Sequence, residues 1–471
     1  MTCSGRLTGD GALLEDTSWT GTVAGTVSRT YDNNFRMNNL SVNESGIGFA
    51  YDNDNLLIQV GNLALTRNAQ HGLISGTTLE GITDSWGYNG FGELTSYSAF
   101  ADASEFYNAQ YTRDKLGRIA QKVETIGGTT TTFDYGYDLA GRLIEVKQNG
   151  ATTASYTYDS NGNRLSGPGL GAAPTYDAQD RLLTYAGNTY TYTANGELAT
   201  KTAGAVVTTY QYDVLGNLRS VALPGGTQID YVIDGQNRRI GKKVNNTLVQ
   251  GFLYQDGLRI VAELDGNNNV VSRFVYGSRA NVPDYMIKGG VRYRILADHL
   301  GSPRLVVDVT DGTIVQRMDY DEFGNVLQDT NPGFQPFGFA GGLYDPQTKL
   351  VRFGARDYDA ETGRWTAKDP ILFEGGDPNL YGYVLNDPIN LIDPTGLEKC
   401  KTKTPREEWE DLKKRITEGN PRPTWEQAKD EMKRIYDRIP WYDAGTKNDI
   451  YYDMNNIIVN YYGGHIVSDI F

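Results

Sequence analysis

The sequence predicts a mainly β protein built of stacked hairpins, followed by a small, mainly α module. Three observations predict this fold class: a composition rich in tyrosine and glycine, a turn phrase that recurs along the chain, and a change of character after Leu397. The 471 residues include 55 glycines and 32 tyrosines, and 39% of them are hydrophobic. Such a chain is long enough for two or three domains with a large core, and its composition favours strands.

The recurring phrase is Tyr-Asp-x-x-Gly-Arg/Asn-Leu or a variant of it. Aspartate and asparagine favour turns because their side chains bond the nearby backbone, and glycine supplies the positive φ that a tight turn needs. Each unit is therefore expected to be a strand, turn and strand that must stack on its neighbours. A generic antiparallel sheet is the alternative, and the narrow spacing of 16 to 21 residues between the copies from Tyr137 to Tyr212 disfavours it. Copies start at or near Tyr51, Tyr88, Tyr111, Tyr137, Tyr158, Tyr176, Tyr192, Tyr212 and Tyr320.

The segment from Tyr293 to Leu397 carries the most distinctive phrases. It contains RILADHLGSPRLVVD, MDYDEFGNVL and FGFAGGLYDPQTKLVRFGARDYDAETGRWTAKDPI, and it ends in NLYGYVLNDPINLIDPTGL. With the tyrosine phrase, these resemble the YD repeats and repeat-associated core of bacterial RHS proteins, of the C components of insecticidal toxin complexes and of the teneurin YD shell. The resemblance implies a spiral of YD-repeat β-hairpins that forms a shell or partial shell, with the core plugging one end.

Four regions follow from this organisation. We expect an N-terminal strand-like segment at 1–30, a YD-repeat β-shell at 31–292, an RHS-associated core with a C-terminal plug and self-cleavage motif at 293–397, and a variable toxin-like module at 398–471. Family shells are usually much longer, and about 390 residues at roughly 20 per hairpin give fewer than twenty hairpins. The chain is therefore expected to form an open half-shell or a small one, as a truncated, split or excised family member.

Asp-Pro pairs crowd the last part of the core. Proline fixes φ and cannot donate a backbone hydrogen bond, so each pair forces a turn, and a plug of tight turns explains any single pair. As a set, the acids also suit peptide hydrolysis, in which two nearby carboxyls share a proton. One carboxyl then activates water while the other protonates the leaving nitrogen. The aspartates of these pairs are Asp345, Asp369, Asp377, Asp387 and Asp393.

The resemblance assigns roles to particular positions. RHS and toxin-complex C proteins cut themselves after the leucine of DPxGL by an aspartyl mechanism. In this sequence the phrase is DPTGL, which places the scissile bond between Leu397 and Glu398. The acid roles carry over to Asp369, in KDPI, and to Asp393, in IDPTGL.

Three further positions belong to this hypothesis. Asp357, in ARDYD, is the substitute for Asp393 as the second acid. Arg364 in TGRW, or Arg356, is expected to orient or stabilise a carboxylate through a bidentate pair. Leu372 stands where the family pattern has glycine, which bears on the geometry of the pocket.

Residues 398–471 differ in kind from the rest. TPREEWEDLKKRITEG and PTWEQAKDEMKRIYDRI begin with capping threonines and place apolar residues at helical spacing, so both predict helices, while 449–459 fits a helix or a strand. By position, the resemblance makes this module a toxin carried as enclosed cargo. Its activity is unassigned, and a nuclease is one option. The absence of Cys-x-x-Cys argues against a zinc deaminase. His465 is the candidate general acid or base of the module, although a lone histidine is more often a surface or packing residue.

Charge and composition disfavour other classes of function. A net charge of −14 argues against nucleic acid or membrane as a partner of the whole chain, leaving nucleic acid to the C-terminal module. Cys3 and Cys400 cannot make a disulfide framework, and the histidines are too few and scattered for a metal centre, so no cofactor is expected. The acidic runs at Asp52 and Asp265 lack the ligand spacing of a calcium loop and predict turns.

The functional hypothesis combines these observations. The N-terminal sequence lacks the pattern of a signal peptide, and no apolar run approaches the roughly 20 residues of a membrane span. The chain is expected to be made in the cytoplasm and exported by a specialised secretion system or delivered to a target cell, with a secretion carrier and an immunity protein as partners. The resulting hypothesis is an RHS-type polymorphic toxin shell that releases its effector by aspartyl autoproteolysis in interbacterial competition. The alternative is a YD-repeat scaffold for carbohydrate binding or adhesion, without catalytic activity.

Overall fold

The computed structural model describes the backbone of residues 2–7, the residues 13–102 and 104–397, and scattered positions between 409 and 461. Within these residues the chain forms two large antiparallel sheets and one small one. In each sheet every strand pairs with the next strand of the sequence, so each sheet is a continuous row of hairpins. This topology confirms the predicted fold class.

The first sheet runs from β1 to β15: β1 (Thr2–Leu7), β2 (Leu14–Thr20), β3 (Gly25–Tyr31), β4 (Met37–Val42), β5 (Ser45–Tyr51), β6 (Leu57–Val60), β7 (Leu63–Arg67), β8 (Ile74–Leu79), β9 (Ile82–Tyr88), β10 (Leu94–Ala101), β11 (Ser104–Arg113), β12 (Ile119–Ile126), β13 (Thr129–Tyr137), β14 (Leu143–Gln148) and β15 (Ala151–Ser155). The second sheet runs from β16 to β31: β16 (Thr175–Tyr176), β17 (Leu182–Tyr185), β18 (Asn188–Tyr192), β19 (Leu198–Ala203), β20 (Val206–Tyr212), β21 (Leu218–Ala222), β22 (Gln228–Ile233), β23 (Arg239–Val244), β24 (Thr247–Tyr254), β25 (Ile260–Leu264), β26 (Val270–Val275), β27 (Tyr285–Lys288), β28 (Val291–Ala297), β29 (Pro303–Asp308), β30 (Ile314–Tyr320) and β31 (Val326–Asp329). The small sheet and three short 3-10 turns complete the described elements: η1 (Phe339–Gly341), β32 (Leu343–Tyr344), β33 (Leu350–Phe353), β34 (Arg356–Asp359), β35 (Arg364–Trp365), η2 (Leu372–Gly375) and η3 (Val384–Asn386).

The repeat phrase forms a turn that is closed by its own aspartate. Asp138 shows the pattern: its Oδ1 accepts the backbone N–H groups of Ala140 and Arg142, each at 2.9 Å. The Arg142 Nε donates to the other carboxylate oxygen at 2.7 Å. The guanidinium of Arg142 then lies 4.9 Å from the ring centre of Tyr158, the tyrosine of the next copy. The hydroxyl of that tyrosine donates back to the carbonyl of Leu143 at 2.7 Å, so each copy is fastened to the one before it.

The same turn occurs in copies that the sequence phrase did not identify. Asp32, Asp234 and Asp298 each accept the N–H groups two and four residues further on. At Asp234 and Asp298 the preceding residue is not tyrosine, so a search for Tyr-Asp misses them. The acidic runs at Asp52 and Asp265 make the same contacts, which confirms their interpretation as turns.

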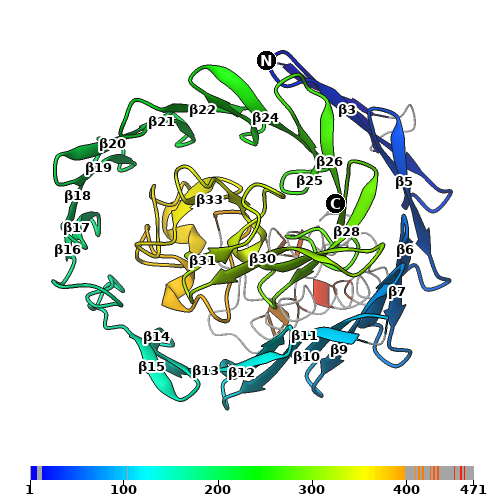
Figure 1. The fold of residues 1–471 in the computed structure, drawn as a ribbon, viewed down its shortest axis with the longest axis horizontal. Helices are drawn as coiled ribbons and strands as arrows, with labels where there is room; N and C mark the ends of the chain where they lie inside the picture. The colour runs from blue at the N-terminus through cyan, green and yellow to red at the C-terminus, as the bar shows by residue number, and fades with distance from the viewer. Residues whose placement is uncertain are drawn as a thin grey trace.

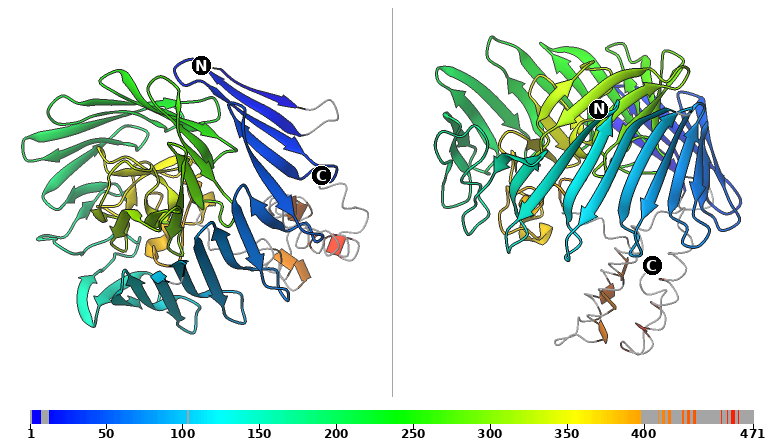
Figure 2. Two further views of the ribbon diagram at one scale, coloured as in Figure 1. Left: turned by 45° about the vertical axis from the view of Figure 1, so that its right-hand side comes forward. Right: turned by 60° about the horizontal axis from the view of Figure 1, so that its bottom comes forward.

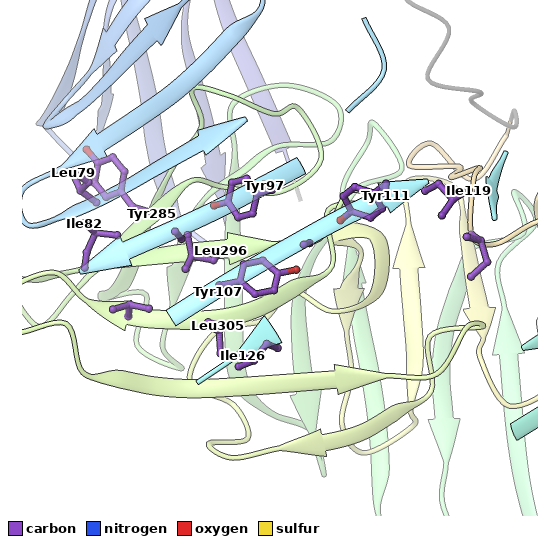
Figure 3. Packing of buried hydrophobic residues seen from close by; sticks show 14 of the residues in the cluster. Leu79, Ile82, Tyr97, Tyr107, Tyr111, Ile119, Ile126, Tyr285, Leu296 and Leu305 are labelled. Atoms are coloured by element: carbon purple, nitrogen blue, oxygen red, sulfur yellow. The ribbon is translucent and has the colours of Figure 1, made fainter. Parts of the chain in front are cut away.

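The two large sheets curve around a common interior and form a ring (Figure 1). Strands β28 and β29 pack against β9–β12 from inside, burying Tyr97, Tyr107, Leu296 and Leu305 in one cluster (Figure 3). A buried ion pair joins the same two layers, with Arg294 Nη2 2.6 Å from Asp84 Oδ2. The chain therefore coils over itself and buries an apolar layer that no single hairpin could cover.

The small sheet and the segment up to Leu397 lie inside this ring (Figure 1). The aromatic side chains of Phe353, Tyr358, Trp365 and Tyr383 pack at the centre of this segment, and Tyr358 and Tyr383 have ring centres 4.3 Å apart. Polar bonds tie it to the surrounding wall, for example from the Tyr381 hydroxyl to the carbonyl of Gly196 at 2.7 Å. We call residues 333–397 the plug.

The described positions between 409 and 461 are all helical. Nine apolar side chains among them form a separate buried cluster: Trp409, Leu412, Ile416, Ala428, Met432, Ile450, Met454, Ile457 and Ile458. Ile450, Met454, Ile457 and Ile458, the described positions of the segment 449–459, are helical. In Figure 2 these positions lie beyond the strand ends of the ring. Within the described residues, no helix combines the length and the apolar character that a membrane span requires.

Candidate functional site

A pocket in the plug brings together distant parts of the sequence. It encloses about 300 Å³ of empty space, part of it open to solvent. The carboxylates of Asp369, Asp377 and Asp393, the guanidinium of Arg356 and the residue Leu397 all line it. The structure thus places both predicted acids and the predicted cleavage residue in one site. Glu398, on the other side of the predicted scissile bond, and His465 lie outside the described residues.

Arg356 holds the two acids together from the first position of β34. Its Nη2 lies 2.8 Å from Asp369 Oδ2 and 3.3 Å from Asp393 Oδ2. The guanidinium stacks on the ring of Trp365 at 4.2 Å, and its Nε donates to the carbonyl of Gly396 at 2.5 Å. Burial lowers the pKa of Arg356, and the charges of the two carboxylates oppose that effect. Since arginine keeps its proton in proteins, it supplies one fixed positive charge to the site.

Asp369 is fixed by the turn that its own Asp-Pro pair begins. The Ile371 N–H donates to its Oδ1 at 3.0 Å, and its own N–H donates to the carbonyl of Leu380 at 3.0 Å. The residue is only 6% exposed. These bonds direct the second oxygen, Oδ2, toward Arg356 and the pocket.

Asp393 forms the start of the DPTGL turn. Its Oδ1 accepts the Thr395 hydroxyl at 3.0 Å and the Leu397 N–H at 3.2 Å, so the acid holds the residue that precedes the predicted cut. Burial raises the pKa of Asp393, and the nearby charge of Asp369 raises it further, while Arg356 opposes both effects. One carboxyl of the pair is therefore predisposed to keep a proton.

The carbonyl of Leu397 lies beside Asp369. A Cβ placed on Gly375, the last residue of η2, would be 2.7 Å from Asp369 Oδ2 and 2.7 Å from the Leu397 carbonyl oxygen. These two oxygens are thus no further apart than twice that distance. Only glycine leaves this space open, because the Cβ of any other residue at position 375 would crowd both oxygens.

Two residues named in the sequence hypothesis occupy other places. Asp357, the substitute second acid, pairs with Arg239 at 2.9 Å and with Arg352 at 3.0 Å, where it ties the plug to β23. Successive residues of a strand point to opposite faces, so Asp357 turns away from the pocket that its neighbour Arg356 enters. Arg364 binds the side-chain oxygen of Asn163 at 2.9 Å in the wall, so of the two arginines considered, Arg356 contacts the acids.

The sequence drew attention to Leu372 but not to Gly375. Leu372 has φ 55°, a left-handed conformation that glycine adopts freely and leucine only at a cost, which explains why glycine suits this position. Gly375 belongs to a GGDP run and Trp365 to TGRW. Their contacts with Asp369, Leu397 and Arg356 depend on how the plug folds, so no local signal in the sequence pointed to them.

The family of the chain follows from its match to the model of the teneurin YD-shell, which covers residues 4–389. The chain belongs to the teneurin YD-shell family. Teneurin-3 of Danio rerio is 32% identical over 387 residues, which are 77% of this chain and 14% of that protein. Toxin protein Tse5 of Pseudomonas aeruginosa is 27% identical over 331 residues, which are 56% of this chain and 25% of Tse5.

Solved structures agree with this assignment at the level of the fold. The crystal structure of TcdB2-TccC3-TEV superimposes with a TM-score of 0.66 at 18% identity, over 83% of this chain and 23% of that one. The Photorhabdus luminescens Tc holotoxin pore with the mutation TccC3-D651A gives a TM-score of 0.59 at 17% identity, over 84% of this chain and 21% of that one. The chain spans about a seventh of the matched teneurin and a quarter of Tse5. It is therefore related to both teneurins and toxin shells.

Proposed function

We propose that this chain is a YD-shell segment of an RHS-type toxin that cuts itself between Leu397 and Glu398 and so releases its C-terminal module as an effector against competing bacteria. One observation carries the proposal: two buried carboxylates share a single guanidinium nitrogen next to the carbonyl of Leu397. Relatedness to Tse5 supports the toxin context. The proposed shell role is that of a part, because the matched solved shells are about four times longer.

The chemistry needs one ionised and one protonated carboxyl. The ionised acid takes a proton from water as the water oxygen bonds to the Leu397 carbonyl carbon. The protonated acid gives its proton to the nitrogen of Glu398 as the carbon–nitrogen bond breaks. The products are a carboxyl group on Leu397 and an amine on Glu398, and the pair as a whole has gained and lost one proton. Asp393, whose pKa is raised, is the better proton donor, and Asp369, beside the carbonyl, is the better base.

Arg356 acts as the positioning residue of this scheme. Two ionised carboxylates in one buried site repel each other, and a shared cation offsets that repulsion. The arginine also accepts no proton, so it cannot replace either acid in the reaction. Its bond to the carbonyl of Gly396 fixes the backbone at the second residue before the cut.

The test compares the wild type with Asp369→Asn and Asp393→Asn. Denaturing electrophoresis of the wild type should show pieces of 397 and 74 residues, and mass spectrometry should place the new N-terminus at Glu398. Both variants should stay whole, with thermal unfolding like that of the wild type. Asp387→Asn is the matched control, because Asp387 is a buried Asp-Pro aspartate of the plug that does not line the pocket, and this variant should still be cut.

Effector release has its own readout. Bacteria expressing the wild-type chain should stop growing, whereas those expressing Asp369→Asn should grow. If the wild type stays uncut, or if Asp369→Asn is still cut, the aspartyl mechanism is ruled out. The adhesion scaffold is then the better supported function. A cut chain with no effect on growth would retain self-cleavage and reject the toxin.

A further inference from the structure

Thr395 occupies the variable position of the DPTGL phrase, between the proposed acid Asp393 and Leu397. Its hydroxyl donates to Asp393 Oδ1 at 3.0 Å and accepts the Leu397 N–H at 3.3 Å. Its carbonyl accepts the Ala355 N–H at 2.8 Å, which ties the turn to the residue before Arg356. The side chain is therefore held against the acid, and the proposed reaction does not use it.

The two carboxylate oxygens of Asp393 have different surroundings. Oδ1 accepts two donors, the Thr395 hydroxyl at 3.0 Å and the Leu397 N–H at 3.2 Å. An oxygen of a carboxylate has two lone pairs, so these two bonds occupy both of them. Within the described residues Oδ2 accepts one donor, Arg356 Nη2 at 3.3 Å, which leaves a lone pair for a proton. A protonated Asp393 therefore carries its hydrogen on Oδ2, the oxygen that shares Arg356 Nη2 with Asp369.

An acid pair shares a proton only through the oxygens that face the common site. We propose that Thr395 is a positioning residue for self-cleavage, whose hydroxyl keeps Asp393 Oδ1 occupied and so holds the shared proton on Oδ2. This inference rests on the proposed function. Thr395 itself exchanges no proton in the reaction.

The variant Thr395→Val removes the hydroxyl and keeps the branched shape of the side chain. One lone pair of Oδ1 is then free, so the proton can occupy the oxygen that does not face Asp369. A hydrogen bond to an ionised group shifts an equilibrium by about tenfold or more, so the cleavage rate at the pH optimum should fall about tenfold. The same bond favours the ionised form of Asp393, so its loss raises the pKa of this acid. Because a tenfold change in this equilibrium equals about one pH unit, the alkaline limit of cleavage should rise by about that much.

The other groups around Asp393 are the same in the wild type and in the variant. The charges of Arg356 and Asp369 act on it, and Asp377 lines the same pocket. The phenol of Tyr383 is buried and neutral, since burial raises its pKa well above 10. A difference in the alkaline limit between the two proteins therefore reports the lost hydroxyl and not the remaining charges of the chain.

The experiment is a pH profile of self-cleavage. Intact chain from cell-free synthesis in the cold is shifted into buffers from about pH 4 to pH 9, and timed samples are quenched for denaturing electrophoresis. Thr395→Ser keeps the hydroxyl and should restore both the rate and the alkaline limit of the wild type. Thr395→Cys has a thiol, which is a weak donor, and its rate and limit should lie between those of the wild type and Thr395→Val. This variant carries the test if the valine variant does not fold.

Thr348→Val is the matched control. Thr348 also follows an Asp-Pro pair of the plug, and its hydroxyl also accepts an N–H two residues further on, from Leu350 at 3.4 Å, but it does not line the pocket. This variant should be cut at the wild-type rate at every pH.

The possible outcomes separate the inference from the proposed function. A wild-type rate and alkaline limit in Thr395→Val overturn the inference and leave self-cleavage intact. A rate lowered equally at every pH, with an unchanged alkaline limit, also overturns it, because that pattern belongs to a residue that only stabilises the turn. If the wild type is not cut at any pH, the proposed function itself fails.

Discussion

Gly375→Ala should block the proposed self-cleavage without disturbing the fold. The added Cβ would stand 2.7 Å from both Asp369 Oδ2 and the Leu397 carbonyl oxygen, whereas real Cβ atoms rarely approach a neighbour closer than 3.4 Å. Each oxygen must therefore move back by several tenths of an ångström. Gly375 does not have a positive φ, so alanine fits its backbone without strain.

The size of the effect follows from this displacement. A misplacement of about 1 Å between reacting groups costs about 10²-fold in rate, and the combined shift of the two oxygens approaches that size. The cleavage rate should fall by roughly this factor, measured by timed quenching of chain made by cell-free synthesis. Thermal unfolding should change by no more than about 2 °C, because the substitution removes no contact of the core.

A matched control separates this effect from a general cost of adding a methyl group. Gly257 also lacks a positive φ, and its added Cβ would meet nothing within 4 Å, so Gly257→Ala should cleave like the wild type. Cleavage of Gly375→Ala at the wild-type rate would show that the gap between Asp369 and the Leu397 carbonyl plays no part in the reaction. The assignment of Asp369 as the group acting on that carbonyl would then be refuted.

Three further predictions concern stability. Arg356→Gln removes the cation that Asp369 and Asp393 share, and should lower the free energy of unfolding by about 3–5 kcal/mol at pH 7 in urea unfolding. Because protonation of the carboxylates removes the uncompensated charge, this loss of stability should shrink as the pH falls toward 4. A loss that does not depend on pH would contradict the charge argument. Burial raises the pKa of Asp387 from 3.8 to about 6, so its ionised form destabilises the fold increasingly as the pH rises through this window. Asp387→Asn should therefore raise the free energy of unfolding by about 2–3 kcal/mol at pH 7 and leave it unchanged below pH 4. An equal increase at both pH values would point to another cause. Leu372→Gly should relieve about 1 kcal/mol of strain from the left-handed backbone of Leu372, and so raise the midpoint of thermal unfolding. A lower midpoint would show that the contacts of the half-exposed leucine side chain contribute more to stability than the backbone strain costs.

The sequence by itself determined the repeating turn. The aspartate, the amides two and four residues on and the glycine all lie within one short stretch, so the turn forms wherever that pattern occurs. For the same reason the phrase also gave the hairpin order of the sheets, since each turn joins consecutive strands. The search for the phrase missed the copies without tyrosine, because the tyrosine ring makes the contact between successive copies and is not needed to form the turn.

Only the tertiary structure decided which side chains share the pocket. Asp369 and Asp393 are 24 positions apart, and Arg356 and Arg364 were equally placed in sequence to serve them. The strand register of β34 decided this, because it turns Arg356 toward the acids and its neighbour Asp357 toward Arg239 in the wall. The gap at Gly375 likewise exists only after the plug has folded, because the two oxygens that define it belong to Asp369 and Leu397, which are 28 positions apart. Local turns depend on neighbours in sequence, whereas a site depends on packing between segments that the sequence leaves apart.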